Sequence, residues 1–263
     1  GAGEVPDFAE ASPTPLVSPS ERDSFNDYYG YSVAVSGDTV VVGAYRDYFS
    51  FMVQGAAHVF VREGDGFELE ESLRAQQPDD GSFFGGSVAV AGDFVAVGAR
   101  AFSDPIDLAG AAYLMSRSGT SWVSQQRLQE VPPREYGNFG AAVAVSGMNA
   151  IIGGEGRAYA YERSGTTWAL TAPLEVDDPP ESFGRSVAMD GDRAIIGSNA
   201  LGQTPDVAHA FVKSGGGWIE EGRLAPASGA QGFGWVVALS GSIAVVGSEG
   251  KDRSEEHTSE LQS

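Results

Sequence analysis

The sequence predicts an all-β chain in which one unit of four antiparallel strands is repeated. The first observation is composition: glycine supplies 36 and proline 13 of the 263 residues, and no apolar run has the period of a helix. The second is self-similarity, because YGYSVAVSGDTVVVGA from Tyr29 returns as FGGSVAVAGDFVAVGA from Phe84. The third is that apolar residues alternate within these stretches, as they do in half-buried strands.

Each repeat opens on an aromatic residue followed by glycine. These pairs recur about every 50 residues, which is a period typical of repeat architectures. The repeat starts are Tyr29, Phe84, Phe139, Phe183 and Phe233. A first strand with period-2 alternation follows each pair: SVAV from Ser32, SVAV from Ser87, AAVAV from Ala141, SVAM from Ser186 and VVAL from Val236.

A tight turn and a second strand come next in every repeat. Glycine reaches the positive φ angles that hairpin turns need. The turns are Gly37-Asp38, Gly92-Asp93, Gly147-Met148, Gly191-Asp192 and Gly241-Ser242. The second strands end on small residues, at Ala44, Ala99, Gly154, Ser198 and Ser248.

Two further strands complete four of the repeats. The third strands start at Gly55, Gly110, Gly156 and Asp206, and each closes on a basic residue. A glycine-rich turn follows, and the fourth strands run from Phe67, Trp122, Trp168 and Trp218 to Leu73, Leu128, Leu174 and Leu224.

Four antiparallel strands without a helix, repeated in this way, predict the blades of a β-propeller. The chain would hold four full blades and the start of a fifth. We expect the small residues that end the second strands to let neighbouring sheets approach closely. We expect the aromatic residue of each aromatic-glycine pair to pack between blades.

The run of FG, SVAVSGD and VVVGA resembles the FG-GAP repeat family, which is known from the propeller of integrin alpha subunits and from bacterial surface proteins. The resemblance covers residues 29 to 250 and implies a ring of seven blades, so that this propeller is incomplete. It also implies an extracellular or cell-surface location. WD-repeat and kelch propellers have similar periods, but their signatures are missing.

Calcium is one point on which the resemblance departs from integrins. Integrin-type repeats resemble DxNxDG and place a calcium loop between the first and second strands. Here only two-residue turns stand at that place, and so short a turn does not wrap a cation. We therefore expect no metal site of this kind and no cofactor.

Three segments are predicted along the chain. Residues 1–16 form an N-terminal leader, which either supplies a ring-closing strand or is a disordered proline-rich segment. Residues 17–251 form the partial propeller. Residues 252–263 hold no strand pattern, and RSEEHTSELQS from Arg253 resembles a translated sequencing adapter, which predicts a non-biological tail.

Composition excludes several classes of function. The 36 acidic residues outnumber the 16 basic ones, and a net charge of −20 repels nucleic acid. No apolar run reaches the roughly 20 residues of a membrane span. With no cysteine, the chain has neither disulfides nor thiolate metal sites.

Catalytic signatures are missing from the sequence as well. His58 and His209 occupy the third-strand position held elsewhere by Tyr113 and Tyr159, so we expect a shared structural role. The acidic pairs Asp79-Asp80 and Asp177-Asp178 could serve as acid and base, but neighbouring prolines favour solvated turns. We predict no catalytic residue in this chain and leave open whether a longer parent protein is an enzyme.

The loops between second and third strands vary most in length and are the candidate binding elements. The first two combine aromatic and charged residues. The candidate ligand-binding residues are Tyr45, Arg46, Asp47, Tyr48 and Phe49 in the first loop, and Phe102, Asp104 and Asp107 in the second. The alternative is that these aromatic residues pack onto the blades.

These observations favour an extracellular binding or adhesion scaffold that presents its loops to a protein or glycan ligand. One alternative is an accessory propeller of a larger secreted enzyme that acts on polysaccharide or hydrolyses another substrate. A second is a structural spacer in a surface protein.

Overall fold

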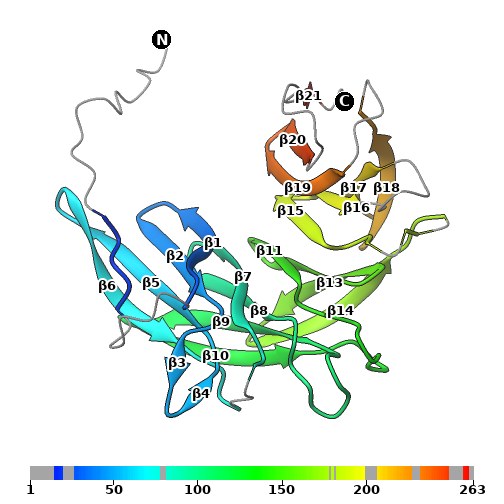
Figure 1. The fold of residues 1–263 in the computed structure, drawn as a ribbon. Coiled ribbons are helices and arrows are strands. Elements are labelled where there is room, and N and C mark those ends of the chain that lie inside the picture. The colour runs from blue at the N-terminus through cyan, green and yellow to red at the C-terminus, as the bar shows by residue number, and fades with distance from the viewer. Residues whose placement is uncertain are drawn as a thin grey trace, which may run out of the picture.

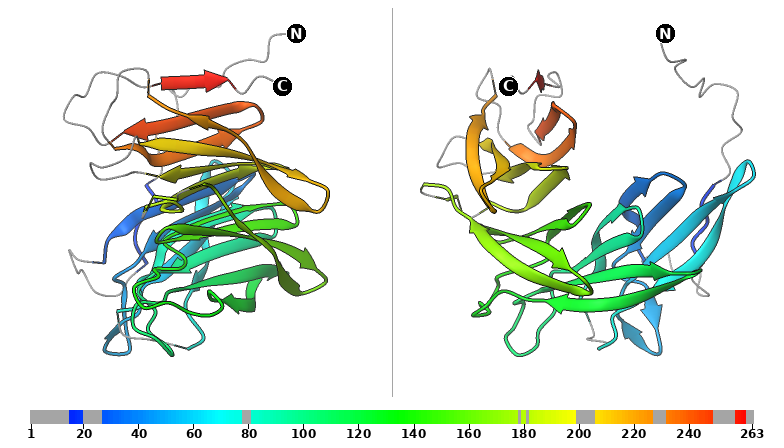
Figure 2. Two further views of the ribbon diagram at one scale, coloured as in Figure 1. Left: turned by 90° about the vertical axis from the view of Figure 1, so that its right-hand side faces the viewer. Right: turned by 180° about the vertical axis from the view of Figure 1, so that it is seen from behind.

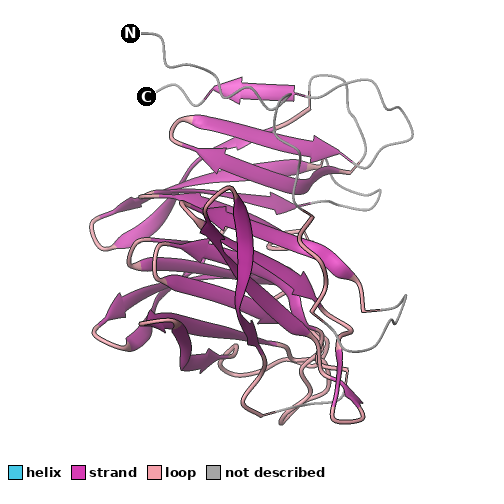
Figure 3. Ribbon diagram, turned by 90° about the vertical axis from the view of Figure 1, so that its left-hand side faces the viewer, coloured by secondary structure: helices cyan, strands magenta, loops and turns pink. Residues whose placement is uncertain are grey.

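The structure is a computed structural model that describes residues 15–19, 27–77, 81–177, 179–180, 182–198, 206–226, 232–248 and 257–260. Every regular element in these ranges is a strand, and Figure 3 shows strands and loops without a helix. Four sheets have four antiparallel strands, one has three, and one is a two-stranded hairpin. The prediction of an all-β fold is confirmed.

Each four-stranded sheet is one predicted blade. Blade 1 contains β1 (Tyr29–Ser36), β2 (Thr39–Ala44), β5 (Ala56–Glu63) and β6 (Gly66–Leu73). Blade 2 contains β7 (Phe84–Ala91), β8 (Phe94–Ala99), β9 (Ala111–Ser118) and β10 (Ser121–Leu128). Blade 3 contains β11 (Ala142–Ser146), β12 (Asn149–Gly154), β13 (Arg157–Ser164) and β14 (Thr167–Leu174). Blade 4 contains β15 (Ser186–Asp190), β16 (Arg193–Ser198), β17 (Val207–Ser214) and β18 (Gly217–Leu224).

The fifth sheet begins with the predicted strands β19 (Phe233–Ser240) and β20 (Ile243–Ser248). A third strand, β21 (His257–Glu260), pairs antiparallel with β20. The expectation that residues 252–263 hold no strand is therefore wrong for these four positions, whose backbones pair with the free edge of β20. The assignment of residues 252–263 as non-biological stays a prediction.

The blades follow one another along an arc, with β1, β7, β11 and β15 on the inner side and the fourth strands on the outer side (Figure 1). The right-hand view in Figure 2 shows the same open arrangement from behind. This is the β-propeller architecture. Residues 1–14 of the leader lie outside the described residues, so the ring-closing strand stays a prediction.

Strand direction divides the propeller into two faces. Because the strands of a blade alternate in direction, the two-residue turns lie at one end, which we call the turn face. The longer loops after the second strands and the connections between blades lie at the other end, which we call the loop face.

The first of the long loops is folded further than predicted. It contains the hairpin of β3 (Tyr48–Phe49) and β4 (Met52–Val53). Its two turn residues, Ser50 and Phe51, have φ angles of 50° and 71°. Because neither turn residue is glycine, the sequence pattern predicts an open loop here and not a hairpin.

Neighbouring blades meet through glycine. A Cβ on Gly43 of blade 1 would overlap the carbonyl oxygen of Gly85 in blade 2, and the same holds at the next three junctions. The glycine pairs are Gly43 with Gly85, Gly98 with Gly140, Gly153 with Gly184, and Gly197 with Gly234. The close approach predicted for the ends of the second strands is confirmed.

Serine hydroxyls reinforce three of these junctions. Ser32 Oγ donates to the Gly85 carbonyl oxygen at 2.8 Å, and Ser87 and Ser186 make the same bond to the glycine of the following blade. Blade 3 has Ala142 at this position, so the junction of blades 3 and 4 has no such serine bond.

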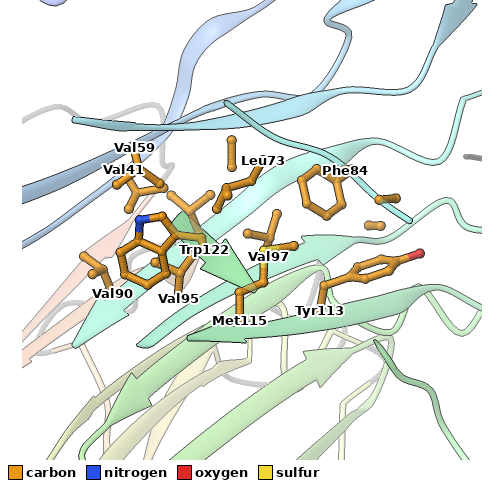
Figure 4. Close-up of a cluster of buried hydrophobic side chains, with 14 of the residues drawn as sticks. Val41, Val59, Leu73, Phe84, Val90, Val95, Val97, Tyr113, Met115 and Trp122 are labelled. Atoms are coloured by element: carbon orange, nitrogen blue, oxygen red, sulfur yellow. The ribbon is translucent and has the colours of Figure 1, made fainter. Parts of the chain in front are cut away.

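The aromatic residue of the aromatic-glycine pair lies between blades at four of the five repeat starts, as predicted, while Tyr29 at the start of blade 1 is half-buried. Phe84, Phe139 and Phe183 are at most 1% exposed. Figure 4 shows Phe84 in the cluster between blades 1 and 2, beside Leu73 and Tyr113. Each such ring packs on the third-strand position shared by histidine and tyrosine, with centroids 5.7 Å apart for Tyr29–His58, 5.2 Å for Phe84–Tyr113, 5.8 Å for Phe139–Tyr159 and 5.2 Å for Phe183–His209.

Candidate ligand-binding surface

A row of three aromatic rings crosses from blade 1 to blade 2 on the loop face. Tyr28 precedes β1, Tyr45 follows β2, and Phe83 precedes β7, so all three sit at strand ends. The ring centroids of Tyr28 and Tyr45 are 4.8 Å apart, and those of Tyr45 and Phe83 are 5.1 Å apart. Tyr31 lies beside the row, 4.6 Å from Tyr45. We call Tyr28, Tyr45 and Phe83 the aromatic row.

A guanidinium stands at each end of this row. Arg46 lies 5.8 Å from the Tyr28 ring centre, and Arg100 lies 5.3 Å from that of Phe83. Both are cation–π distances. Both arginine side chains are exposed.

The two end rings stand on unusual backbone. Tyr28 has a φ of 54° and Phe83 a φ of 59°, both in the left-handed region that bulky residues rarely occupy. The equivalent positions before Phe139 and Phe233 hold Asn138 and Gly232, which suit that conformation. Strained backbone of this kind clusters at binding sites.

The row is accessible and uncharged. Tyr28 is 46% and Tyr31 is 58% exposed, while Tyr45 is half-buried between them. Burial, together with the neighbouring Tyr28 and Tyr31 hydroxyls, raises the pKa of Tyr45 above its ordinary value of 10.0. The surface therefore offers flat apolar rings edged by neutral hydroxyl groups and flanked by positive charge.

The β3–β4 hairpin holds two more of the predicted residues. Phe49 is 50% exposed, and the Arg74 guanidinium lies 4.5 Å from its ring centre. Tyr48 Oη donates to the Phe51 carbonyl oxygen at 2.9 Å, which stabilises a tip where Phe51 is 85% exposed.

Asp47 does not belong to the exposed surface. It is fully buried, and its carboxylate contacts Arg74 Nη2 at 3.1 Å and His58 Nε2 at 3.5 Å. Burial alone would raise the pKa of Asp47, but the His58 hydrogen bond and the Arg74 charge outweigh it and hold the pKa below 3.8. Asp47 therefore anchors the loop from beneath.

Phe102 takes the place of Asp47 in blade 2. The Gly110 amide donates to the Phe102 carbonyl at 2.9 Å, just as the Gly55 amide donates to the Asp47 carbonyl at 3.0 Å. Phe102 is 2% exposed under Arg127. For Phe102 the alternative given by the sequence holds, namely that the aromatic residue packs onto the blade, because its loop turns inward at this shared position.

Asp104 and Asp107 are exposed on the second loop. Their carbonyl oxygens accept hydrogen bonds from Gln129 Nε2 at 2.7 Å and from the Tyr136 amide at 3.1 Å. Among the described residues, no hydrogen bond, ion pair or ring contact joins their side chains to the aromatic row. The structure thus brings only Tyr45 and Arg46 of the predicted residues into this surface.

Catalytic and metal chemistry find little support in the described part of the chain. Hollows of about 350 and 400 Å³ lie along β10, and glutamine, arginine and aromatic side chains line them without carboxylates or histidine. The described ranges hold no group of three or more histidine or carboxylate side chains that could share a metal ion. Asp79, Asp80 and Asp178 lie outside the described residues.

Sequence reasoning missed Tyr28, Tyr31, Phe83 and Arg100. A signal was present, because an aromatic residue precedes the aromatic-glycine pair only in the first two repeats, at Tyr28 and Phe83. Those two repeats are also the ones whose contact forms the row.

Comparison with known proteins agrees with this fold. Residues 23–60 and 67–115 match the FG-GAP repeat model, so these two segments are FG-GAP repeats. A crystal structure of a protein from Lactobacillus plantarum is similar, with a TM-score of 0.55 and 15% identity, over 89% of this chain and 70% of that one. No curated protein matches the sequence. At that identity, the structural likeness speaks for the fold alone.

Proposed function

We propose that this chain, a β-propeller carrying FG-GAP repeats, is an extracellular binding scaffold that captures its ligand on the loop face. FG-GAP repeats are typical of extracellular proteins. The described residues contain no helix of the length and apolarity that a membrane crossing needs. The observation that carries the proposal is the aromatic row, whose rings lie side by side across a blade junction, with Tyr28 exposed and Tyr45 and Phe83 half-buried.

The energetic cost of the backbone conformation at Tyr28 and Phe83 supports a role in binding. Tyr28 and Phe83 hold left-handed backbone that costs on the order of 1–3 kcal/mol at each position. Their rings remain accessible, so this cost is not recovered through burial in a core. Exposed aromatic clusters of this kind are the surfaces that proteins use to anchor ligands.

The alternative from the sequence is an accessory propeller that holds a polysaccharide for an attached enzyme. It would use the same aromatic row, and in neither function does this chain itself cleave the polysaccharide. Incubating the protein with polysaccharides and measuring new reducing ends therefore tests for catalysis by this chain. We expect no new reducing ends.

The binding test uses Tyr28→Asn and Phe83→Asn. Asparagine occupies the equivalent position at Asn138 with a φ of 47°, so both variants keep the backbone while removing a ring. Tyr136→Asn is the matched control, because Tyr136 is 59% exposed with a φ of 56° but stands outside the row. We expect labelled protein to bind members of an array of glycans and extracellular proteins.

The expected result is that Tyr28→Asn and Phe83→Asn weaken that binding about tenfold or more, since a central aromatic contact contributes about 2 kcal/mol. Tyr136→Asn should bind like the parent chain. Unchanged binding by both row variants would rule out the aromatic row as the ligand site.

A further inference from the structure

We infer that the ligand of the aromatic row is an acidic glycan in which carboxylates are separated by uncharged sugar. This inference rests on the proposed function and specifies its ligand. The carrying observation is the linear order Arg46, Tyr28, Tyr45, Phe83, Arg100, in which each group contacts the next.

The two arginines differ from all other described basic residues. Neither Arg46 nor Arg100 forms a side-chain hydrogen bond or ion pair with a described residue, and each guanidinium lies over an aromatic ring. Every other described arginine, and Lys213, has a polar side-chain partner. In a chain with 36 acidic and 16 basic residues, two unpaired guanidinium groups stand out.

The neighbouring carboxylate is already engaged. The Arg46 amide donates to the Asp27 carbonyl oxygen at 3.2 Å. The Asp27 carboxylate, however, accepts from the Tyr29 amide and the Ser18 hydroxyl, both at 3.1 Å. Arg46 therefore keeps its N–H groups available for an anion, which guanidinium binds with paired hydrogen bonds.

The spacing of the charges indicates the class of ligand. Three rings separate the two guanidinium groups, so a ligand that meets both must carry two anions with an apolar stretch between them. A glycan with alternating uronate and neutral sugars has this pattern, and the apolar faces of its sugar rings fit flat aromatic side chains. The net charge of −20 disfavours densely charged polyanions, but screening over about 10 Å lets isolated carboxylates be bound locally.

The test measures calorimetric binding of a hyaluronan hexasaccharide, whose carboxylates alternate with neutral sugars. The matched ligand is the same hexasaccharide with its carboxyl groups reduced to alcohols. The variants are Arg46→Gln and Arg100→Gln. The control variant is Arg62→Gln, because Arg62 also lies over a ring, Phe67 at 4.7 Å, but pairs with Asp38 at 3.1 Å near the turn face.

We expect the carboxylated hexasaccharide to bind, and Arg46→Gln and Arg100→Gln each to weaken binding about tenfold. The reduced hexasaccharide should bind at least tenfold more weakly, and Arg62→Gln should have no effect. If both hexasaccharides bind equally and neither arginine variant matters, the acidic specification is wrong, while the aromatic row stays the binding site.

A second probe separates glycan from protein ligands. If hexaglutamate binds through Arg46 and Arg100 and the hexasaccharide does not, the ligand is an acidic protein segment, and the glycan inference is overturned. Failure of the carboxylated hexasaccharide to bind at millimolar concentration overturns it too. The proposed function itself falls only if Tyr28→Asn and Phe83→Asn leave array binding intact.

Discussion

At the scale of single residues, one position illustrates how the repeats share geometry but differ in chemistry. The third-strand position packs on the preceding aromatic ring in four blades, yet its polar partners are local. His58 Nδ1 lies 2.9 Å from Ser72 Oγ, whereas Tyr159 Oη donates to Glu130 at 2.5 Å. His209 Nδ1 lies 2.8 Å from Glu220. The ring position is common to the repeats, whereas its polar partner comes from the fourth strand of the same blade for His58 and His209 and from the connection between blades 2 and 3 for Tyr159.

His209 should make stability depend on pH. Burial lowers the pKa of the His209 imidazole below 6.5 and outweighs the opposing effect of Glu220. Because the unfolded chain then binds the proton more readily, the stability contribution is present above pH 6.5 and is lost as pH falls below it. We expect His209→Tyr, the residue found at this position in blades 2 and 3, to reduce this loss, measured by urea unfolding from pH 7 to 5.

The dependence of the unfolding free energy on pH should become less steep by at most about 1.4 kcal/mol per pH unit. His209→Phe, which also cannot titrate, should flatten the slope to the same extent and so separates titration from the added hydroxyl. If the unfolding free energy falls equally steeply with pH in the parent chain and in both variants, His209 does not cause the loss of stability between pH 7 and 5.

At the scale of elements, each fourth strand carries a β-bulge at the same place, at Glu70, Gln125, Thr171 and Glu221. In blades 1 and 2 the bulged side chain contacts the next blade. Glu70 pairs with Arg117 and accepts from Trp122 Nε1 at 2.8 Å. Gln125 accepts from Arg163 at 3.3 Å. Arg117 and Arg163, the basic residues that close the third strands of blades 2 and 3, thus link each blade to the one before it.

The junction of blades 3 and 4 lacks this link. Thr171 is too short to reach across, and Lys213 bonds Asn149 and Glu162 instead. Trp218 Nε1 is buried and has no hydrogen-bond partner among the described residues. We expect Thr171→Glu to accept from Trp218 Nε1 as Glu70 does from Trp122. Satisfying that donor should raise the free energy of unfolding by about 1 kcal/mol, measured by urea denaturation at pH 7.

Thr171→Ala is the matched control, because it loses only the Thr171 hydroxyl bond to the Ala160 carbonyl at 3.1 Å. It should be no more stable than the parent chain. If the free energy of unfolding of Thr171→Glu is also no higher than that of the parent chain, the side chain at the bulge does not reach Trp218.

The elements themselves were largely predictable, because period-2 alternation and the glycine turns mark strand positions directly. Bulges were not, since the same residue alternation fits a strand with or without one extra residue. The β3–β4 hairpin escaped for a related reason: its turn uses Ser50 and Phe51 where the rules expect glycine. Of the aromatic row and its two flanking arginines, only Tyr45 and Arg46 were predicted. The other residues come from segments that only the folded chain brings together.

At the scale of the whole molecule, both ends of the arc present apolar sheet faces. On β1, Ala34 packs inward, while Val33 and Val35 point the other way and are 67% and 69% exposed. In the fifth sheet, Ile243 and Val245 are 49% and 45% exposed. Exposed rows of this kind bury readily against another apolar face.

We expect this chain to self-associate through these faces. Sedimentation velocity should show a weight-average mass that rises with concentration. Val33→Lys combined with Val35→Lys should shift the chain toward monomer, because the lysines repel each other across an interface. The control is Val123→Lys, since Val123 is 51% exposed on β10, away from the end faces. A monomer at every concentration would contradict the expectation.

The glycine contacts between blades have a consequence for how such a protein can change. The glycine pair of each junction is a contact between backbone atoms that all four junctions share, so this part of the junction makes the same demand on every blade. A blade can therefore be duplicated, or exchanged together with its loop, with this contact kept. Transplanting the residues between Gly43 and Gly55 into the corresponding interval of blade 2 would move a recognition element to a new place on the same frame. Such a protein can therefore acquire new ligands by recombining whole blades or loops while the glycine contacts stay unchanged.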